Sequence, residues 1–345
     1  MISRVGVLTG GGDCPGLNAV IRGVVRRSLM HGGYEIVGIK YGWRGLLEKQ
    51  TMPLARADVR GILHRGGTIL GTSRTNIFKN EDLTKKAIEN FKAMKLDALI
   101  AIGGEDTLGA AKKLGDRGIK VVGCPKTIDN DLNGTDLTFG FDTAVMIATE
   151  AIDRLHTTAE SHDRVLVCEV MGRHAGWIAT YAGLAGGADA ILVPEKPINV
   201  DEVCESVIRR SRMGVNFSII VVAEGAKIAG QDEVLASKKV DEFGHVQLGG
   251  IGAMLTKQIE QKTGFDTRVT VLGHVQRGGT PTAFDRILAT RYGVAAMDAV
   301  HSGHFGVLVA LRGNDIVEVP LSEVSEGIRT VDENFYQMTK TFWGF

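Results

Sequence analysis

Two adjacent carboxylates, Glu105 and Asp106, follow directly after a glycine pair at residues 103–104, and an apolar run at residues 98–102 precedes them. The run has the composition of a buried strand, so the glycines and the acids lie where that strand ends. Glycines at such an end let a phosphate approach the backbone, but neighbouring carboxylates repel it unless a cation intervenes. The pattern therefore predicts a phosphate site that holds a metal ion and selects among phosphates.

A second polar loop contains three consecutive glycines, residues 10–12, after an apolar run at residues 4–8. Consecutive glycines leave their amide N–H groups open to an anion, and a helix is expected to begin after this loop. The glycine spacing does not match the dinucleotide-binding fingerprint, and no Gly-Lys-Ser/Thr sequence follows, as a P-loop requires. The loop therefore predicts either a phosphate cradle or a tight turn that needs left-handed backbone.

A third polar loop follows a strand expected to end at residue 122. It places a cation, a hydroxyl and two carboxylates close together, in Lys126, Thr127, Asp129 and Asp131. If the segment is extended, Asp129 and Asp131 point to the same side, so one could act as a base while the other binds or orients a metal ion. A turn rich in Asn and Asp is the alternative interpretation.

Arginines beside glycines and strand ends form a further group, namely Arg74, Arg164, Arg173, Arg268 and Arg277. A guanidinium suits phosphate because it donates two hydrogen bonds at once, although a single arginine is more often part of a surface ion pair. Lys+Arg and Asp+Glu number 40 each, so no net charge attracts nucleic acid or an anionic membrane. Any anion site must therefore be built from locally gathered arginines.

Short β-branched runs alternate with longer amphipathic stretches, which is typical of parallel strands connected by helices. The pattern predicts strands at residues 4–8, 35–39, 98–102, 120–122, 164–170, 190–193, 217–222, 268–272 and 306–310. It predicts helices at residues 17–30, 83–94, 142–158, 201–212, 252–262 and 284–302. No linker interrupts the 345 residues, so a domain division is expected to pass through an ordinary loop, best placed at residues 133–140.

Other parts of the chain are less specific. No stretch approaches the apolar length of a membrane span and no signal-type region opens the chain, so we expect a cytoplasmic protein. The four cysteines lack paired spacing and are expected to be reduced and mostly buried. Residues 231–245 are expected to form an exposed, charged excursion. Residues 341–345 are aromatic and are expected to dock on the protein surface.

In combination, seven blocks make the chain resemble the phosphofructokinase superfamily: LTGGGDCPGLNAVIRG, GGEDT, PKTIDND, SHDR, EVMGRHAGW, VAEG and TRVTVLGHVQRGG. The resemblance implies two three-layer α/β domains with the active site in the cleft between them, and a dimer or a tetramer. It implies a donor and metal domain at residues 1–140 plus roughly 277–325, and a sugar-phosphate domain at residues 141–276 plus roughly 326–345. The implied reaction transfers a phosphoryl group to the 1-hydroxyl of fructose 6-phosphate.

The resemblance also implies roles for individual residues. Gly11 matches a donor-phosphate contact, Glu105 the acid linked to magnesium, and Asp129 the general base. Arg74 and Arg173 match positions near the transferring phosphate. Sugar-phosphate contacts are implied for Thr127, Ile128, Asp129, Met171, Gly172, Arg173, Glu224, His274, Val275, Gln276 and Arg277, and Asp131 lines the same site. Arg164 and Arg268 match arginines that reach the 6-phosphate from a neighbouring subunit, so the active site would be complete only in an oligomer.

The phosphoryl donor depends on Asp106 and Lys126. ATP-dependent relatives usually carry glycine at both positions. Asp106 places a negative group where the α-phosphate of ATP would lie, and Lys126 supplies a cation near the leaving phosphate. The pair resembles the pyrophosphate-dependent enzymes, which work near equilibrium and so serve glycolysis or gluconeogenesis.

Two alternatives stay open beside pyrophosphate. The chain could use ATP, or it could be a phosphate-binding regulator without activity, although a regulator is expected to lose Asp129 or the metal acid first. Sedoheptulose 7-phosphate is a further possible acceptor. Arg22, Arg26 and Arg154 resemble part of an effector pocket whose lysine pair is missing here, so weak allosteric control is expected.

Overall fold

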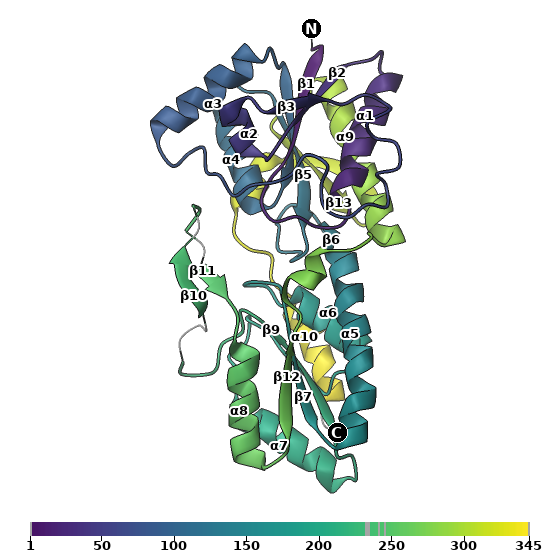
Figure 1. The fold of residues 1–345 in the computed structure, drawn as a ribbon, viewed down its shortest axis with the longest axis vertical. Coiled ribbons are helices and arrows are strands. Elements are labelled where there is room, and N and C mark those ends of the chain that lie inside the picture. The colour runs from purple at the N-terminus through teal and green to yellow at the C-terminus, as the bar shows by residue number, and fades with distance from the viewer. Residues whose placement is uncertain (1, 232–234, 241, 245, 344–345) are drawn as a thin grey trace.

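The computed structural model describes residues 2–231, 235–240, 242–244 and 246–343. Figure 1 shows two bodies stacked end to end, each built around its own sheet. The larger sheet has eight strands, and seven of them follow the order β14-β13-β5-β4-β1-β2-β3, while β6 pairs with β5. Its strands are β1 (Arg4–Thr9), β2 (Glu35–Ile39), β3 (Thr51–Pro53), β4 (Ala98–Gly103), β5 (Val121–Thr127), β6 (Phe139–Gly140), β13 (Val307–Arg312) and β14 (Asp315–Pro320).

Helices cover both faces of this sheet, because its strands are apolar on both sides. Val7 packs into the core under α1 (Leu17–Met30) and α9 (Ala283–Ser302), whereas its neighbour Leu8 points to the opposite face. That opposite face is covered by α2 (Trp43–Glu48), α3 (Glu81–Ala93) and α4 (Glu105–Asp116). Helices α1 and α9 cross closely, since a side chain at Gly293 would collide with the carbonyl of Val20.

The smaller sheet has four parallel strands in the order β12-β7-β9-β8. They are β7 (Val165–Val170), β8 (Ala190–Leu192), β9 (Ser218–Ala223) and β12 (Thr267–Val271). Helices α5 and α6 lie on one side of the sheet and α7 and α8 on the other (Figure 1). The helices of this body are α5 (Phe141–His162), α6 (Trp177–Ala185), α7 (Val200–Arg212), α8 (Ile251–Thr263) and α10 (Glu333–Thr339).

The remaining elements connect or extend the two bodies. A hairpin of β10 (Leu235–Val240) and β11 (Val246–Leu248) leaves the smaller body between β9 and α8. Three short 3-10 helices are η1 (Gly273–Arg277), η2 (Leu321–Ser325) and η3 (Lys340–Phe342). Within the described ranges, no helix has both the length and the apolar character needed to cross a bilayer. All four cysteines are free and buried, which confirms that prediction.

The predicted alternation of strands and helices is confirmed, and the helix predicted over residues 17–30 has those bounds. One local prediction is wrong, because the strand expected to end at residue 122 continues to Thr127, so Lys126 lies inside a strand. The helix that follows the three glycines has Gly16, in a left-handed conformation, as its N-cap.

Helix α4 was not predicted, since residues 103–107 were interpreted as a loop. The acids Glu105 and Asp106 form its first turn, with Gly104 as N-cap. Negative side chains are favourable there because unpaired N–H groups carry partial positive charge. Trp177 begins α6 and is buried, as expected of a packing residue. Trp343 is also buried, edge-on to Tyr336, and residues 344–345 lie outside the described residues.

A buried carboxylate joins the two bodies at the point where the chain passes from β6 into α5. Asp285, in the first turn of α9, accepts hydrogen bonds from the Gly140 amide at 2.9 Å and from the amide and hydroxyl of Thr143 at 2.8 and 2.5 Å. It is fully buried, and burial raises the pKa of its carboxyl to about 6 despite these donors. Asp285 therefore ties the N-termini of α5 and α9 together.

Asp285→Asn should change how stability depends on pH. Because the folded-state pKa lies above the ordinary 3.8, the carboxyl's contribution is fully present below 3.8 and is lost as pH rises through about 6. The wild type should lose up to about 3 kcal/mol of unfolding free energy across this window, and the variant should not. Urea unfolding at about pH 4 and about pH 7 measures the difference. If the unfolding free energies of the wild type and the variant changed equally with pH, the raised pKa of Asp285 would be wrong.

Candidate active site

The three polar loops of the larger body lie side by side. Ladder pairing places Thr9 of β1 beside Ile102 of β4, and Gly103 of β4 beside Pro125 of β5. Because the strands are parallel, their carboxyl ends share one edge of the sheet, and each of the three loops leaves from that edge. The adjacency expected from the sequence is therefore present.

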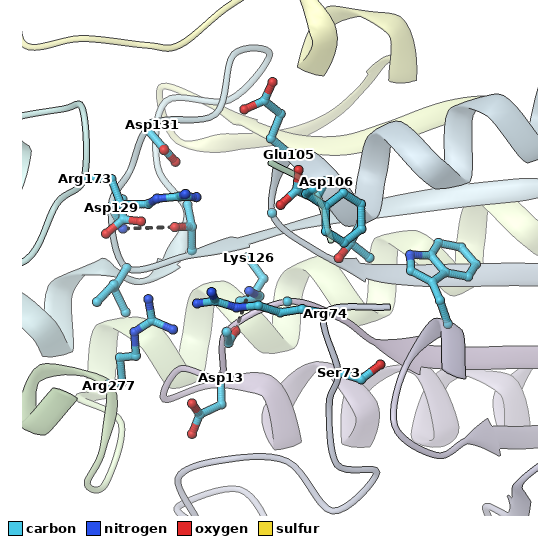
Figure 2. A pocket seen from close by; sticks show the side chains of 18 residues that line it. Asp13, Ser73, Arg74, Glu105, Asp106, Lys126, Asp129, Asp131, Arg173 and Arg277 are labelled. Atoms are coloured by element: carbon cyan, nitrogen blue, oxygen red, sulfur yellow. Dashed lines mark hydrogen bonds between the residues drawn. The ribbon is translucent and has the colours of Figure 1, made fainter. Parts of the chain in front are cut away.

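The carboxyl ends of the smaller sheet form the opposite wall. Val170 of β7 pairs with Ala223 of β9. Arg173 comes three residues after Val170, and Glu224 comes directly after Ala223. Figure 2 shows the resulting pocket, with Ser73, Arg74 and Asp106 toward one end and Asp129, Arg173 and Arg277 toward the other. Both bodies line it, with Gly11, Gly12, Asp13, Trp43, Ser73, Arg74, Gly104, Glu105, Asp106, Thr107, Lys126, Thr127, Ile128, Asp129, Asp131, Arg173, Phe243 and Arg277.

Lys126 lies beneath the glycine loop. Its Nζ donates to the Gly12 carbonyl at 2.6 Å, its side chain is 4% exposed, and burial lowers the pKa of its ammonium group. The amides of Gly10 and Gly11 donate to the carbonyls of Ile102 and Ser73, so these two are not open to an anion. Because these two amides are used within the protein, the positive charge offered to an anion at this loop comes from the Lys126 ammonium group and from the other backbone amides of the loop.

Glycine is favoured at residues 11 and 12 for different reasons. Gly11 has a φ of 76°, in the left-handed region that other residues adopt at a cost. A Cβ at Gly12 would collide with the guanidinium of Arg277, which would have to move. The absence of a side chain at Gly12 therefore lets the guanidinium of Arg277 approach the loop as it does.

The Asp129 carboxylate is buried, with 5% of its area exposed, and its Oδ1 has no hydrogen-bond partner in the described structure. The chain turns at Asn130, whose φ is 52°, so the segment is not extended as the simplest sequence interpretation assumed. Asp129 and Asp131 nevertheless both line the pocket. A buried carboxylate oxygen without a donor is poised to accept a proton or a ligand hydrogen.

Arg329 holds this turn from the opposite side. Its Nη1 donates to the Asn130 carbonyl at 3.3 Å and its amide donates to the Asp131 carbonyl at 2.9 Å. Its guanidinium stacks 4.4 Å from the centre of the Trp177 ring, whose Nε1 donates to the Arg329 carbonyl. The loop that carries Asp129 is thus fastened to the smaller body by the C-terminal segment.

Crowded carboxylates shift two of their pKa values upward. Burial, then the nearby charge of Asp129, raises the pKa of Asp131 to about 7. The same two causes, in the same order, raise the pKa of Glu224 to about 7. Each of these groups can therefore hold or release a proton near neutral pH.

The pocket's acids fit a metal that is held partly by its substrate. No group of three His, Cys, Asp or Glu side chains in the described ranges could hold a metal ion by itself. Oxygen donors are nevertheless present in Glu105, Asp129 and Asp131, and Asp129 has an unpartnered oxygen. Magnesium in phosphoryl-transfer sites typically binds one or two carboxylates and completes its shell with waters and substrate phosphates. The residues present fit such an ion.

Arg173 is positioned by strained backbone. Its φ is 51°, after a Gly172 with φ of 140°, and its amide donates to Glu224 Oε1 at 3.3 Å. Left-handed conformations cost energy for residues other than glycine and cluster at functional sites. Arg173 is therefore held toward the pocket by Gly172 and by Glu224.

The segment from residue 273 to 277 forms η1. Gln276 is fully buried, where its Oε1 accepts from the Met171 amide at 3.4 Å and its Nε2 donates to the Gly273 carbonyl. Its amide group is thus used within the protein. His274 and Val275 are exposed on the same turn, and Arg277 points into the pocket (Figure 2).

Arg164 and Arg268 are not brought into this pocket. Both contact Asp266 at 2.5 Å, at the starts of β7 and β12, whereas the pocket lies at the opposite ends of these strands. Arg22 and Arg26 lie elsewhere again, lining a groove with Arg56 and Arg60 that does not include Arg154. The weak allosteric control expected from the sequence stays a prediction.

Sequence reasoning missed two aromatic residues of the pocket, Trp43 and Phe243. Trp43 opens α2, a helix too short to show a clear period. Phe243 lies within residues 231–245, which were expected to be an exposed excursion, but the described part of this segment belongs to the β10–β11 hairpin and brings Phe243 to the pocket. No local pattern marks either residue.

The chain belongs to the phosphofructokinase family, whose model matches residues 4–300. A pyrophosphate–fructose 6-phosphate 1-phosphotransferase of Streptomyces coelicolor is 60% identical, over 99% of this chain and 100% of that protein. ATP-dependent 6-phosphofructokinase 3 of the same organism is 52% identical, over 96% and 98%. A Pichia pastoris phosphofructokinase in the T-state superposes with a TM-score of 0.82 at 34% identity, covering 94% of this chain and 35% of that one.

The coupling of the pocket carboxylates can be tested directly. Asp129→Asn removes the neighbouring charge, so the pKa of Asp131 should fall from its value of about 7, while burial keeps it above the ordinary 3.8. Carbon NMR of labelled aspartate carboxyls measures the titration. Asp136→Asn, at a surface ion pair with Arg312, is the matched control and should leave Asp131 unchanged. An Asp131 titration that Asp129→Asn does not move would show that the two groups do not interact.

Proposed function

We propose that this protein transfers a phosphoryl group from pyrophosphate to the 1-hydroxyl of fructose 6-phosphate. The products are fructose 1,6-bisphosphate and phosphate, and the reaction is reversible, so it serves glycolysis or gluconeogenesis. The choice of donor rests on one observation. The Asp106 carboxylate and the buried Lys126 ammonium group line the same pocket.

Overall similarity supports this donor less sharply than the two residues do. The pyrophosphate-dependent relative is 60% identical and the ATP-dependent relative 52%, a modest difference between two proteins of the same family. Asp106 lies at the end of the pocket opposite Arg173 and Arg277 (Figure 2). A nucleotide would have to pass this carboxylate with a further phosphate, and repulsion opposes that.

The chemical step uses Asp129 as the base. As the O1–phosphorus bond forms and the bridging P–O bond of pyrophosphate breaks, the 1-hydroxyl proton passes to the Asp129 carboxylate. Its buried Oδ1, which has no other partner in the described structure, is the oxygen suited to receive it. In the reverse direction the same carboxyl returns the proton.

Cations on both walls stabilise the phosphates. Lys126 faces the leaving phosphate at the glycine loop, where Gly11 lets it approach. Arg74 and Arg173 contribute from the larger and smaller bodies, so positive charge meets the transferring group from two sides. Closing the two bodies on the substrates would bring both arginines to that group.

Magnesium is the metal we assign, with Glu105 as its protein ligand and the donor phosphates completing its shell. When bound, the ion neutralises phosphate charge and orients the donor. Glutamate stands where many relatives have aspartate, so its longer side chain would hold the ion directly or through a water. Its place in the first turn of α4 holds this carboxylate at the donor end of the pocket.

The sugar phosphate occupies the other end. Thr127, Ile128, Met171, Gly172 and Glu224 surround the sugar, and His274, Val275, Gln276 and Arg277 form the 6-phosphate end. Gln276 acts from within the protein by holding η1 against Met171. The larger body, residues 1–140 plus roughly 277–325, takes the donor and the metal. The smaller one, residues 141–276 plus roughly 326–345, takes the sugar phosphate.

Self-association would complete the 6-phosphate site. Arg164 and Arg268 lie away from this chain's own pocket. Arg164 directly precedes β7, and Arg268 lies on β12, a strand at the edge of the sheet. Beside Arg268, Val269 and Val271 are 37% and 55% exposed, which is unusual for a valine pair on an edge strand. A second copy covering this edge would bury the two valines, and the two arginines would then reach the pocket of that second copy.

An ATP-dependent phosphofructokinase is the second candidate, and the Trp43 ring in the pocket is the observation that favours it. An inactive regulator is disfavoured, because Asp129 and Glu105 are both present in the pocket.

A donor assay decides between pyrophosphate and ATP. The wild type should react with pyrophosphate and barely with ATP, and Asp106→Gly should raise the ATP to pyrophosphate ratio of kcat/KM by about a hundredfold or more, since one partly buried repulsive charge is removed. Asp116→Gly, at the far end of the same helix, is the matched control. A wild type that prefers ATP would overturn the proposed donor, and an Asp106→Gly variant with unchanged preference would overturn the role of Asp106.

Mixing two inactive variants tests the shared site. Asp129→Ser should lower kcat by orders of magnitude with little change in KM, and Arg268→Ala should abolish saturation by fructose 6-phosphate. In a two-fold pair, refolding the two variants together at equal amounts should restore about a quarter of wild-type sites, because each mixed pair contains one intact site. Mixtures that stay inactive would mean that each site lies within one chain.

A further inference from the structure

The hairpin tip crosses from the smaller body to the donor end of the pocket. The hairpin lies between β9 and α8 in the sequence and so extends from the smaller body. Its Glu242 nevertheless contacts Asn76, which belongs to the larger body. The Asn76 amide donates to Glu242 Oε2 at 2.9 Å, and Asn76 Nδ2 donates to the Glu242 carbonyl at 3.3 Å. Asn76 is itself fixed, because its Oδ1 accepts from the Phe78 amide at 2.9 Å. Two hydrogen bonds therefore anchor the tip.

This anchor determines where the next residue lies. Asn76 comes two residues after Arg74, so Phe243 is brought to the end of the pocket that contains Ser73 and Arg74. Figure 2 shows Ser73 on the same side of the pocket as Asp106, away from Arg173 and Arg277, while the Arg74 side chain extends from that side toward Lys126. Phe243 is half-buried there and lines the pocket.

We propose that Phe243 limits the length of the phosphoryl donor, so that the hairpin is a second determinant of donor specificity beside Asp106. The inference rests on the proposed function, in which pyrophosphate lies in the pocket beside the glycine loop and Lys126. A longer donor must extend away from the sugar phosphate, toward Asp106 and Phe243. The carboxylate opposes it by charge, whereas the phenyl ring takes up volume and offers no hydrogen bond to a phosphate.

The two determinants differ in their dependence on salt. Repulsion by a partly exposed carboxylate weakens as ionic strength rises, because mobile ions screen it. Steric exclusion by the Phe243 ring does not weaken with ionic strength. An inhibitor that carries one phosphate more than pyrophosphate, and no base or sugar, separates length from nucleotide recognition. Inorganic tripolyphosphate is that probe.

The experiment measures competitive inhibition of the pyrophosphate reaction by tripolyphosphate, as the ratio of its Ki to the KM of pyrophosphate. Phe243→Ala should lower this ratio roughly tenfold, and the drop should persist at high salt. Phe243→Leu keeps most of the bulk and should stay near the wild type. Glu242→Ala removes the side-chain half of the anchor and should lower the ratio in the same direction. Phe342→Ala, at a phenylalanine 57% exposed near the C-terminus, is the matched control.

The outcomes separate the two proposals. If the wild type reacts with pyrophosphate and Phe243→Ala leaves the ratio unchanged, the role of Phe243 is wrong while the proposed function stands. If the wild type prefers ATP, the proposed function fails, whatever the variants do. A drop in the ratio that disappears at high salt would also overturn the inference, because it would assign the effect to charge.

Discussion

The structure depends on a balance of opposite charges that are partly removed from water in one pocket. Five acids, Asp13, Glu105, Asp106, Asp129 and Asp131, line it together with Lys126 and three arginines. Each charge taken alone would be costly to bury, and the raised pKa of Asp131 and the lowered pKa of Lys126 show this cost. Phosphate groups and a divalent cation complete such a balance, which explains why the pocket suits these ligands.

The two-body architecture allows this charge density. Each sheet ends in its own set of polar side chains, and the two edges face each other across the pocket instead of packing together. Three devices keep them in register: Asp285 joins the starts of α5 and α9, Arg329 fastens the Asp129 turn to Trp177, and Glu242 anchors the hairpin tip to Asn76. Hydrogen bonds to charged groups are stronger than neutral ones, and Asp285 is fully buried, whereas Glu242 is exposed.

Relatives named for pyrophosphate and for ATP are 60% and 52% identical to this chain, so overall similarity separates the two donors only weakly. In the proposed function, the donor is selected by charge at the first turn of α4 and by volume at the hairpin tip. Both can vary without disturbing the sheets, because neither position lies within a core strand.

The sequence by itself determined the alternating α/β pattern and the three polar loops at strand ends. Period and composition are local properties, and parallel strands bring their carboxyl ends to one edge. The same reasoning selected Glu105, Asp129, Lys126 and all three of the pocket's arginines. A turn was one of two interpretations of the loop that carries Asp129, and the structure decided for it: the chain turns at Asn130, whose carbonyl accepts from Arg329, almost two hundred residues away. Only the tertiary structure decided that Phe243 reaches the pocket and that Arg164 and Arg268 lie outside this chain's own pocket. These placements come from contacts between distant segments, and such contacts leave no periodic signal along the chain.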